Sequence, residues 1–210
     1  MPDFDPADAD DQGLVAVGGD LTPSTLLRAY RRGVFPWYGE GLPICWWSPD
    51  PRAVIPFDGL HISRRLARTI RASKFHITLD QDFVGVLRGC ADRPSDGTWL
   101  LPEMIEAYSQ LHDLGYAHSI EAWLGGELAG GIYGVALGGL FAAESMFHRV
   151  TDASKVALAA LVQRLRDCGF TLLDVQIINP HTERMGAIEI PRDEYLARLR
   201  DAVEMEIHLR

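Results

Sequence analysis

The sequence has few cysteines and no long apolar run. Its 210 residues include only three cysteines, Cys45, Cys90 and Cys168, which are widely spaced and odd in number. This usage indicates reduced thiols rather than a disulfide framework, and no Cys or His spacing resembles a zinc site. No run approaches the ~20 apolar residues of a membrane-spanning helix. We therefore expect a cytoplasmic protein with no membrane segment and no bound metal.

The N-terminus lacks the features of a secretory signal. Residues 1–11 are acidic and have neither the basic nor the apolar region of a signal peptide. The composition, 47% hydrophobic and 23% charged, suits a folded chain of one domain or two small ones. The net charge of -9 argues against non-specific nucleic-acid binding by the whole surface.

A local run of cations interrupts this acidic balance. Its members are Arg64, Arg65, Arg68, Arg71 and Lys74. We expect a helix over residues 63–72, which would place Arg64, Arg68 and Arg71 in one stripe. A solvated helix face is the usual explanation of such a run. The alternative is a patch that binds phosphate groups.

Apolar periodicity and turn residues predict the order of the elements. The first are a strand at 15–20, a helix at 23–32 that ends at Gly33, and an aromatic, Pro-rich stretch at 34–52 with little regular structure. Later strands are expected at 75–80, 119–124, 128–137, 140–147 and 172–178, and helices at 81–91, 102–114, 153–168 and 191–203. A β meander followed by a helix and a strand is the order of an acyltransferase-like α/β fold of the N-acetyltransferase type.

Two polar residues stand in the last predicted strand, which is otherwise apolar. In a strand over 172–178, Asp174 and Gln176 share one face, because residues two apart point the same way. A buried carboxylate costs several kcal/mol unless it is paired. A satisfied structural pair, or a strand with one wet face, explains this pattern as well as an active site does.

Short motifs in a fixed order run along nearly the whole chain. They are Gly18-Gly-Asp-Leu-Thr22, Arg32-Gly-Val-Phe-Pro-Trp37, Trp46-Trp-Ser-Pro-Asp-Pro-Arg52, Leu60-His-Ile-Ser-Arg64, Gly97-Thr-Trp99, Glu144-Ser-Met-Phe147, Ala153-Ser-Lys155 and Asp174-Val-Gln176. Together they closely resemble the bacterial leucyl/phenylalanyl-tRNA–protein transferases, from about Gly18 to Leu199.

The resemblance implies a fold and a reaction. The fold is α/β with a mixed sheet: a small N-terminal α/β domain (1–55) beside an N-acetyltransferase-like (GNAT-like) catalytic domain (56–210). The reaction moves leucine or phenylalanine, and less readily methionine, from aminoacyl-tRNA to the N-terminal Arg or Lys of an acceptor protein. The product is marked for degradation through the N-degron pathway. We also expect no cofactor, and a monomer, because nothing in the sequence suggests an obligate oligomer.

The resemblance also assigns residues to the site. Asp174 and Gln176 are the implied catalytic residues. The residues implied in substrate binding are Trp37, Trp99, Ile132, Phe141, Glu144, Ser145, Met146 and Leu173. The aromatic members would stack on the 3′-terminal adenosine of tRNA, and the aliphatic members and Met146 would line the pocket for the transferred side chain. Glu144 would select the cationic side chain of the acceptor, and the basic helix would hold the acceptor arm of tRNA.

The reaction is the aminolysis of an ester. The α-amino group of the acceptor has a pKa near ~8, so part of it is already neutral and a strong base is not essential. Positioning the substrates and stabilising the oxyanion help more. Gln176 can donate a hydrogen bond to that oxyanion or accept one from the amine. Our hypothesis is that Gln176 participates directly and Asp174 is its electrostatic partner, while base, relay and oxyanion roles all stay open.

Two other classes of protein compete with this interpretation. An acetyl-CoA-dependent N-acetyltransferase needs a Gly-rich turn before its helix to hold a pyrophosphate. Residues 146–154 contain no glycine, which argues against that class. A non-catalytic RNA-binding module would use the basic helix and the tryptophans, but it leaves Asp174, Gln176 and Glu144 without a purpose.

Overall fold

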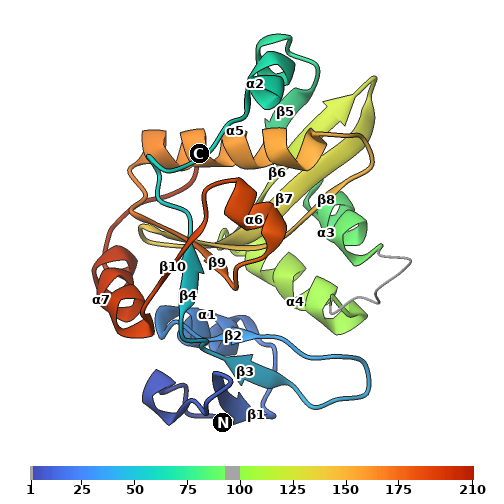
Figure 1. Cartoon of the computed structure of the whole chain (residues 1–210). Helices are drawn as coiled ribbons and strands as arrows, with labels where there is room; N and C mark the ends of the chain where they lie inside the picture. Colours follow the sequence, from blue (N-terminus) through green and yellow to red (C-terminus); the bar gives the residue numbers. More distant parts are fainter. Residues whose placement is uncertain (1, 93–99) are drawn as a thin grey trace.

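Two β-sheets organise the chain (Figure 1). The computed structural model describes residues 2–92 and 100–210. The smaller sheet has the strand order β1-β3-β2 and consists of β1 (Leu14–Val17), β2 (Phe35–Pro36) and β3 (Cys45–Trp47). The larger sheet has the strand order β10-β4-β9-β8-β7-β6-β5.

The larger sheet is mixed. Its strands are β4 (Arg52–Val54), β5 (His76–Leu79), β6 (Ala117–Leu124), β7 (Glu127–Leu137), β8 (Leu140–His148), β9 (Leu172–Gln176) and β10 (Ile188–Ile190). Strands β8 and β9 run parallel, and every other pair of neighbours is antiparallel. This arrangement confirms the expected mixed α/β class. The meander β6-β7-β8, the helix that follows it and the parallel strand β9 are the elements expected of an N-acetyltransferase-like domain.

Helices cover both faces of the larger sheet. The described residues form the helices η1 (Pro6–Asp8), α1 (Pro23–Arg31), α2 (Arg64–Arg71), α3 (Phe83–Ala91), α4 (Pro102–Asp113), α5 (Ala153–Cys168), α6 (Pro180–Arg184) and α7 (Arg192–Val203), of which η1 packs beside β1 of the smaller sheet. One hydrophobic cluster joins α1, α3, α4 and α7 to the sheet, and a second joins α2 and α5 to its other face. Figure 1 shows α5 lying along that second face.

Most long elements fall where the sequence predicts them. The helix expected at 153–168 is α5, and it ends at Gly169, whose φ of +86° suits the left-handed cap. The strand expected to reach residue 178 ends at Gln176, because Gln176 itself has a left-handed φ of +58°. The short elements β4, α6 and β10 were not predicted.

The N-terminal part is joined closely to the rest of the chain. Strand β4 precedes the boundary expected at residue 55, yet it pairs with β9 and β10 in the larger sheet. Tyr30 of α1 is buried in the same hydrophobic cluster as Tyr108 of α4. The division into residues 1–55 and 56–210 stays a prediction.

Candidate functional site

A pocket opens where β8 and β9 separate. The two strands pair only as far as Ala142 and Asp174. Beyond that point, residues 143–146 of β8 and residues 175–178 line a pocket of about 700 Å³. Strand β9 continues only to Gln176, whose backbone is left-handed, so the chain turns out of the sheet just after the pairing with β8 has ended.

Several elements complete the wall of this pocket. Its other lining residues come from the N-terminal part, β7, α5 and the segment around α6. They include Phe35, Pro36, Trp37, Ile132, Ser154, Leu158, Asn179, His181 and Thr182. A concave, mostly apolar cavity with a few convergent polar groups is the usual form of a small-molecule binding site.

A β-bulge aims the carboxylate of Glu144. Tyr133 of β7 pairs with Ser145 and Gly134 pairs with Ala143, so Glu144 is the extra residue between them. A bulge turns a side chain away from the regular alternation of the strand. Glu144 therefore reaches a set of hydrogen-bond donors that come from other elements.

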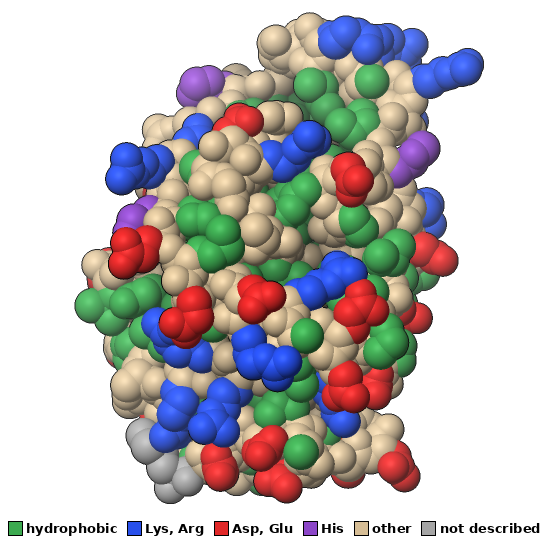
Figure 2. Space-filling view, turned by 90° about the vertical axis from the view of Figure 1, so that its left-hand side faces the viewer, with side chains coloured by type: hydrophobic (Ala, Val, Ile, Leu, Met, Phe, Trp, Pro, Cys, Tyr) green, Lys and Arg blue, Asp and Glu red, His purple; other side chains and the backbone are tan. Residues whose placement is uncertain are grey.

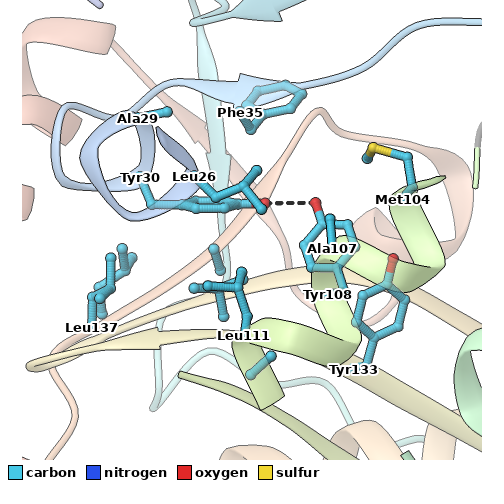
Figure 3. Packing of buried hydrophobic residues seen from close by; sticks show 14 of the residues in the cluster. Leu26, Ala29, Tyr30, Phe35, Met104, Ala107, Tyr108, Leu111, Tyr133 and Leu137 are labelled. Carbon is cyan, nitrogen blue, oxygen red and sulfur yellow. Dashed lines mark hydrogen bonds between the residues drawn. The ribbon is translucent and has the colours of Figure 1, made fainter. Parts of the chain in front are cut away.

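The donors to Glu144 are neutral. Its Oε1 accepts a hydrogen bond from Nε2 of Gln176 at 2.9 Å, and its Oε2 accepts one from the Tyr108 hydroxyl, also at 2.9 Å. The Tyr108 hydroxyl in turn lies 2.8 Å from the Tyr30 hydroxyl (Figure 3). This chain of hydrogen bonds links the pocket to the core between α1 and α4.

This environment changes the acidity of Glu144. Burial raises the pKa of its carboxyl to about 7, although hydrogen bonds from Tyr30 and Tyr108 act in the lowering direction. Burial also raises the pKa values of Tyr30 and Tyr108 well above 10.0. Both hydroxyls consequently stay protonated near neutral pH, while Glu144 exchanges its proton there.

Asp174 lies in a different environment. Its Oδ1 accepts from Nε of Arg52 at 2.9 Å and its Oδ2 accepts from Nη2 at 2.7 Å, which is a bidentate ion pair. Both side chains are only 1% exposed. The Tyr195 hydroxyl donates to the same Oδ2 at 2.9 Å, and the backbone N–H of Gln176 donates to Oδ1 at 2.9 Å. Asp174 is thus fully paired and fixes the backbone of Gln176.

Arg52 is equally constrained. Its Nη1 donates to the carbonyl oxygen of Gly33 at 3.1 Å, and its guanidinium lies 4.5 Å from the centre of the Tyr195 ring. Burial alone would lower the pKa of Arg52, but Asp174 and Tyr195 outweigh burial and raise it. A Cβ at Gly33 would lie within 2.9 Å of Tyr195, so the close approach of this loop requires glycine.

The structure brings most of the predicted site residues to the pocket. Those that line it are Trp37, Ile132, Glu144, Ser145, Met146 and Gln176. Asp174, Phe141 and Leu173 are each 1% exposed and lie in the interior rather than on the pocket wall. Trp99 lies outside the described residues. The catalytic and substrate-binding roles of all these residues stay predictions.

The basic helix α2 contacts the start of α5, and the first turn of α5 lines the pocket. All five cations of residues 64–74 are exposed. Figure 2 shows Lys and Arg side chains gathered at the top of the molecule, the height at which Figure 1 places α2. Nε of Arg65 lies 3.6 Å from Oδ2 of Asp152, the residue that precedes α5. Ser154, two residues further on, lines the pocket.

Sequence reasoning missed the partners of the two carboxylates. Arg52 ends the motif at residues 46–52, and a lone cation before the apolar residues 53–55 is a signal that it would be buried and paired. Nothing in the sequence separates Tyr30 and Tyr108 from ordinary core residues of amphipathic helices. Their importance depends on the bulge at Glu144, which is visible only in the structure.

The meander, α5 and the parallel strand β9 define a mixed α/β protein with an open pocket between its diverging strands. Comparison of the sequence with known families identifies a particular family within this fold class. Residues 54–200 match the leucyl/phenylalanyl-tRNA protein transferase family, and residues 19–50 match the N-terminal domain of the same family. The chain belongs to the leucyl/phenylalanyl-tRNA–protein transferase family, and it is an enzyme.

Relatives support this assignment along nearly the whole chain. The leucyl/phenylalanyl-tRNA–protein transferase of Nitratidesulfovibrio vulgaris (strain DP4) is 57% identical over 201 residues, which cover 94% of this chain and 86% of the relative. The corresponding protein of Anaeromyxobacter sp. (strain Fw109-5) is 55% identical over 207 residues, which cover 97% and 87%.

Solved structures show more distant similarity. A ribosomal-protein-alanine N-acetyltransferase from Brucella melitensis biovar Abortus 2308 has a TM-score of 0.39 and 19% identity, covering 50% of this chain and 81% of its own. L-PGS from Bacillus licheniformis has a TM-score of 0.41 and 14% identity, covering 76% and 52%. Within the described part of the chain, no helix combines the length and apolar character needed to cross a membrane.

Proposed function

We propose that this protein transfers leucine or phenylalanine, and less readily methionine, from aminoacyl-tRNA to the N-terminal Arg or Lys of an acceptor protein. Membership of the family supports the reaction class. The observation that carries the proposal is the pocket between β8 and β9, in which the Gln176 amide and the Glu144 carboxylate meet among apolar walls. An aminoacyl ester needs such a combination: apolar walls for its side chain and polar groups at its carbonyl.

The donor occupies the apolar part of the pocket. The transferred side chain packs against Ile132 and Met146, and the unbranched Met146 adapts to more than one apolar shape. The 3′-terminal adenosine stacks on Trp37, which lines the pocket and is 45% exposed. Such a stacking contact is worth ~1–3 kcal/mol.

Gln176 acts at the ester carbonyl. Its side chain lines the pocket, and its backbone N–H is held by Asp174, so the amide is positioned before the substrate arrives. Positioned donors stabilise the oxyanion that forms when the amine adds to the carbonyl carbon. Asp174 contacts Arg52 and Tyr195 instead of the pocket, and it therefore acts through Gln176.

The acceptor arm of tRNA lies on α2. Exposed cations that contact phosphates bind without sequence preference and lose affinity as salt rises. The contact between Arg65 and Asp152 places this helix beside the start of α5 and thus beside the rim of the pocket. Five exposed cations on an otherwise acidic chain suit this role.

The acceptor enters as a doubly cationic residue. An N-terminal Arg or Lys brings an α-ammonium group and a charged side chain. Among the described residues, Glu144 is the carboxylate that lines the pocket, which supports binding of the α-amino group of the acceptor there. We further propose that the product enters N-degron degradation, and that the protein acts as a monomer in the cytoplasm, where its donor tRNA is charged.

Transfer of labelled leucine tests this function. We expect transfer from leucyl-tRNA to a peptide that begins with Arg, and little or none to a matched peptide that begins with Ala. Acetyl-CoA in place of leucyl-tRNA is the control for the competing class. Acetylation of the peptide, or tRNA binding without transfer, would contradict the proposal.

A further inference from the structure

The reaction requires two proton transfers, which positioning of the substrates alone does not provide. When a neutral amine adds to the ester carbonyl, its nitrogen gains a positive charge and must lose a proton. When the intermediate collapses, the ribose oxygen of tRNA leaves and must gain a proton. A single group that first accepts and then donates serves both steps, and such catalysis contributes ~10²–10⁴-fold.

We propose that Glu144 carries this proton, with its two carboxylate oxygens held by the amide of Gln176 and the hydroxyl of Tyr108. This assignment rests on the proposed function and refines it, because it gives Glu144 a role in the reaction itself. Tyr108 is a positioning residue. Glu144 is a catalytic residue in the strict sense, since it contacts the reacting nitrogen and then the leaving oxygen.

The step balances without any further reactant. The lone pair of the neutral α-amine forms the new C–N bond, and the carbonyl electron pair moves onto oxygen. The ionised carboxylate of Glu144 takes one proton from the nitrogen. The oxyanion then reforms the C=O bond and breaks the C–O bond to ribose, and the protonated Glu144 gives its proton to the ribose oxygen. The products are an amide and a free hydroxyl, with Glu144 ionised again.

Geometry favours Glu144 over Asp174 for this role. Both oxygens of Asp174 are engaged by Arg52, and Asp174 does not line the pocket. The oxygens of Glu144 accept hydrogen bonds from neutral donors such as the Gln176 amide and the Tyr108 hydroxyl. In the described part of the chain, no guanidinium binds both of them as Arg52 binds Asp174. Glu144 also binds the side chain of Gln176, which places it beside the proposed oxyanion site.

Titratable side chains from several neighbouring elements surround Glu144. They are Tyr30 of α1, Tyr108 of α4, Arg52 of β4, Tyr133 of β7, Asp174 of β9, and the pocket histidines His148 and His181. Among them, the charge of Asp174 raises the pKa of Glu144 and the charge of Arg52 lowers it. The raised pKa of Glu144, about 7, suits a group that must both accept and donate near neutral pH.

The decisive experiment is the pH dependence of single-turnover transfer by wild type and Glu144→Gln. In wild type, the rate should rise through two ionisations, one near 7 from Glu144 and one near ~8 from the acceptor amine. Glu144→Gln should keep only the ionisation near ~8. Its deficit should be about 10²-fold at pH 8 and should shrink roughly tenfold by pH 6, where wild-type Glu144 is itself protonated.

The acceptor tests the rival role of Glu144 as a reader of the cationic side chain. Peptides that begin with Arg and with citrulline have the same shape but differ in charge. On our proposal, Glu144→Gln slows both peptides by the same factor. Selective loss of the Arg peptide, with the ionisation near 7 unchanged, would overturn the proposal and favour side-chain recognition. Absence of transfer by the wild type itself would instead overturn the proposed function.

Two further variants separate catalysis from structure. Tyr108→Phe removes a donor to the charged form of Glu144, so the lower ionisation should move to higher pH by about one unit. An unmoved ionisation would remove Tyr108 from the mechanism. Glu121→Gln is the matched control, because Glu121 is a fully buried carboxylate of the same sheet that is held by Thr78 and Ser119 and does not line the pocket. Its pH profile should equal that of wild type.

Discussion

Two carboxylates on neighbouring strands of this protein have opposite surroundings. Asp174 of β9 faces a guanidinium and is paired on both oxygens. Glu144 of β8 faces an amide and a phenol, and no cation among the described residues forms an ion pair with it. A carboxylate paired on both oxygens serves structure, whereas burial among neutral donors raises the pKa of Glu144 and lets it exchange a proton.

The largest loss of free energy of unfolding should follow from breaking the ion pair between Arg52 and Asp174. Arg52→Ala leaves Asp174 buried without a counter-ion, and loss of one partner of a buried pair costs about 3–5 kcal/mol. Denaturant unfolding followed by circular dichroism measures this loss. Arg198→Ala is the control, because the pair of Arg198 with Glu194 on α7 is about half exposed and should contribute below ~1 kcal/mol.

Equal losses in Arg52→Ala and Arg198→Ala would contradict the structural role of the buried pair. A second comparison sharpens the test. Replacing Arg52 and Asp174 together by Met and Leu removes both charges, and it should cost less than Arg52→Ala alone, because no unpaired charge is left behind.

The next largest effect concerns the group between the two carboxylates. Gln176→Ala removes the amide that lines the pocket and binds Glu144, so the rate of transfer should fall by about 10²–10³-fold. The backbone N–H that binds Asp174 remains, and the midpoint of thermal unfolding should change little. Measured transfer within a few-fold of wild type would exclude Gln176 from the chemistry.

Replacing Glu144 should have a smaller effect, and it should raise the free energy of unfolding instead of lowering it. Its native pKa of about 7 exceeds its ordinary value of 4.5, so the native state binds more protons than the unfolded state between these values. The free energy of unfolding therefore falls as pH rises from 4.5 to 7, and the loss is complete above 7. Glu144→Gln carries no charge and escapes this loss.

Thermal unfolding at two pH values measures this difference. Because Glu144 is only partly buried, we expect Glu144→Gln to be about 1–2 kcal/mol more stable than wild type at pH 8. This corresponds to a melting temperature higher by about 2–8 °C. At pH 4.5 the two proteins should melt within a degree or so of each other. A variant that is less stable than wild type at pH 8 would show that the ionised form is the favoured one.

The sequence predicted the helices and strands around this site better than the side-chain contacts within it. Long amphipathic or alternating segments such as 128–137 and 153–168 are found almost as expected, because their apolar period matches one kind of element. The strand at 172–178 was expected to be two residues longer. The left-handed backbone of Gln176 ends it, and no residue-type rule predicts that conformation for glutamine.

Side-chain pairings between distant segments were not predictable from periodicity. Arg52 and Asp174 are 122 residues apart, and Tyr108 reaches Glu144 only because a bulge turns that side chain toward α4. Resemblance to the family named Glu144, Asp174 and Gln176 as site residues. It could not show that Asp174 is held in an ion pair whereas Glu144 is held by neutral donors. That distinction comes from three-dimensional contacts alone.

The smallest expected effect concerns charges that lie in water instead of in the core. Arg68 and Arg71 are exposed on α2, and screening weakens their contacts with phosphates as salt rises. Replacing both by Ala should lower the slope of log affinity for tRNA against log salt by about 1.4–1.8 and reduce affinity severalfold at moderate salt. Transfer from saturating tRNA should be unchanged, because neither residue lines the pocket. Filter binding at four salt concentrations measures the slope. If it is unchanged, these surface cations do not contact tRNA, and α2 is an ordinary solvated helix face.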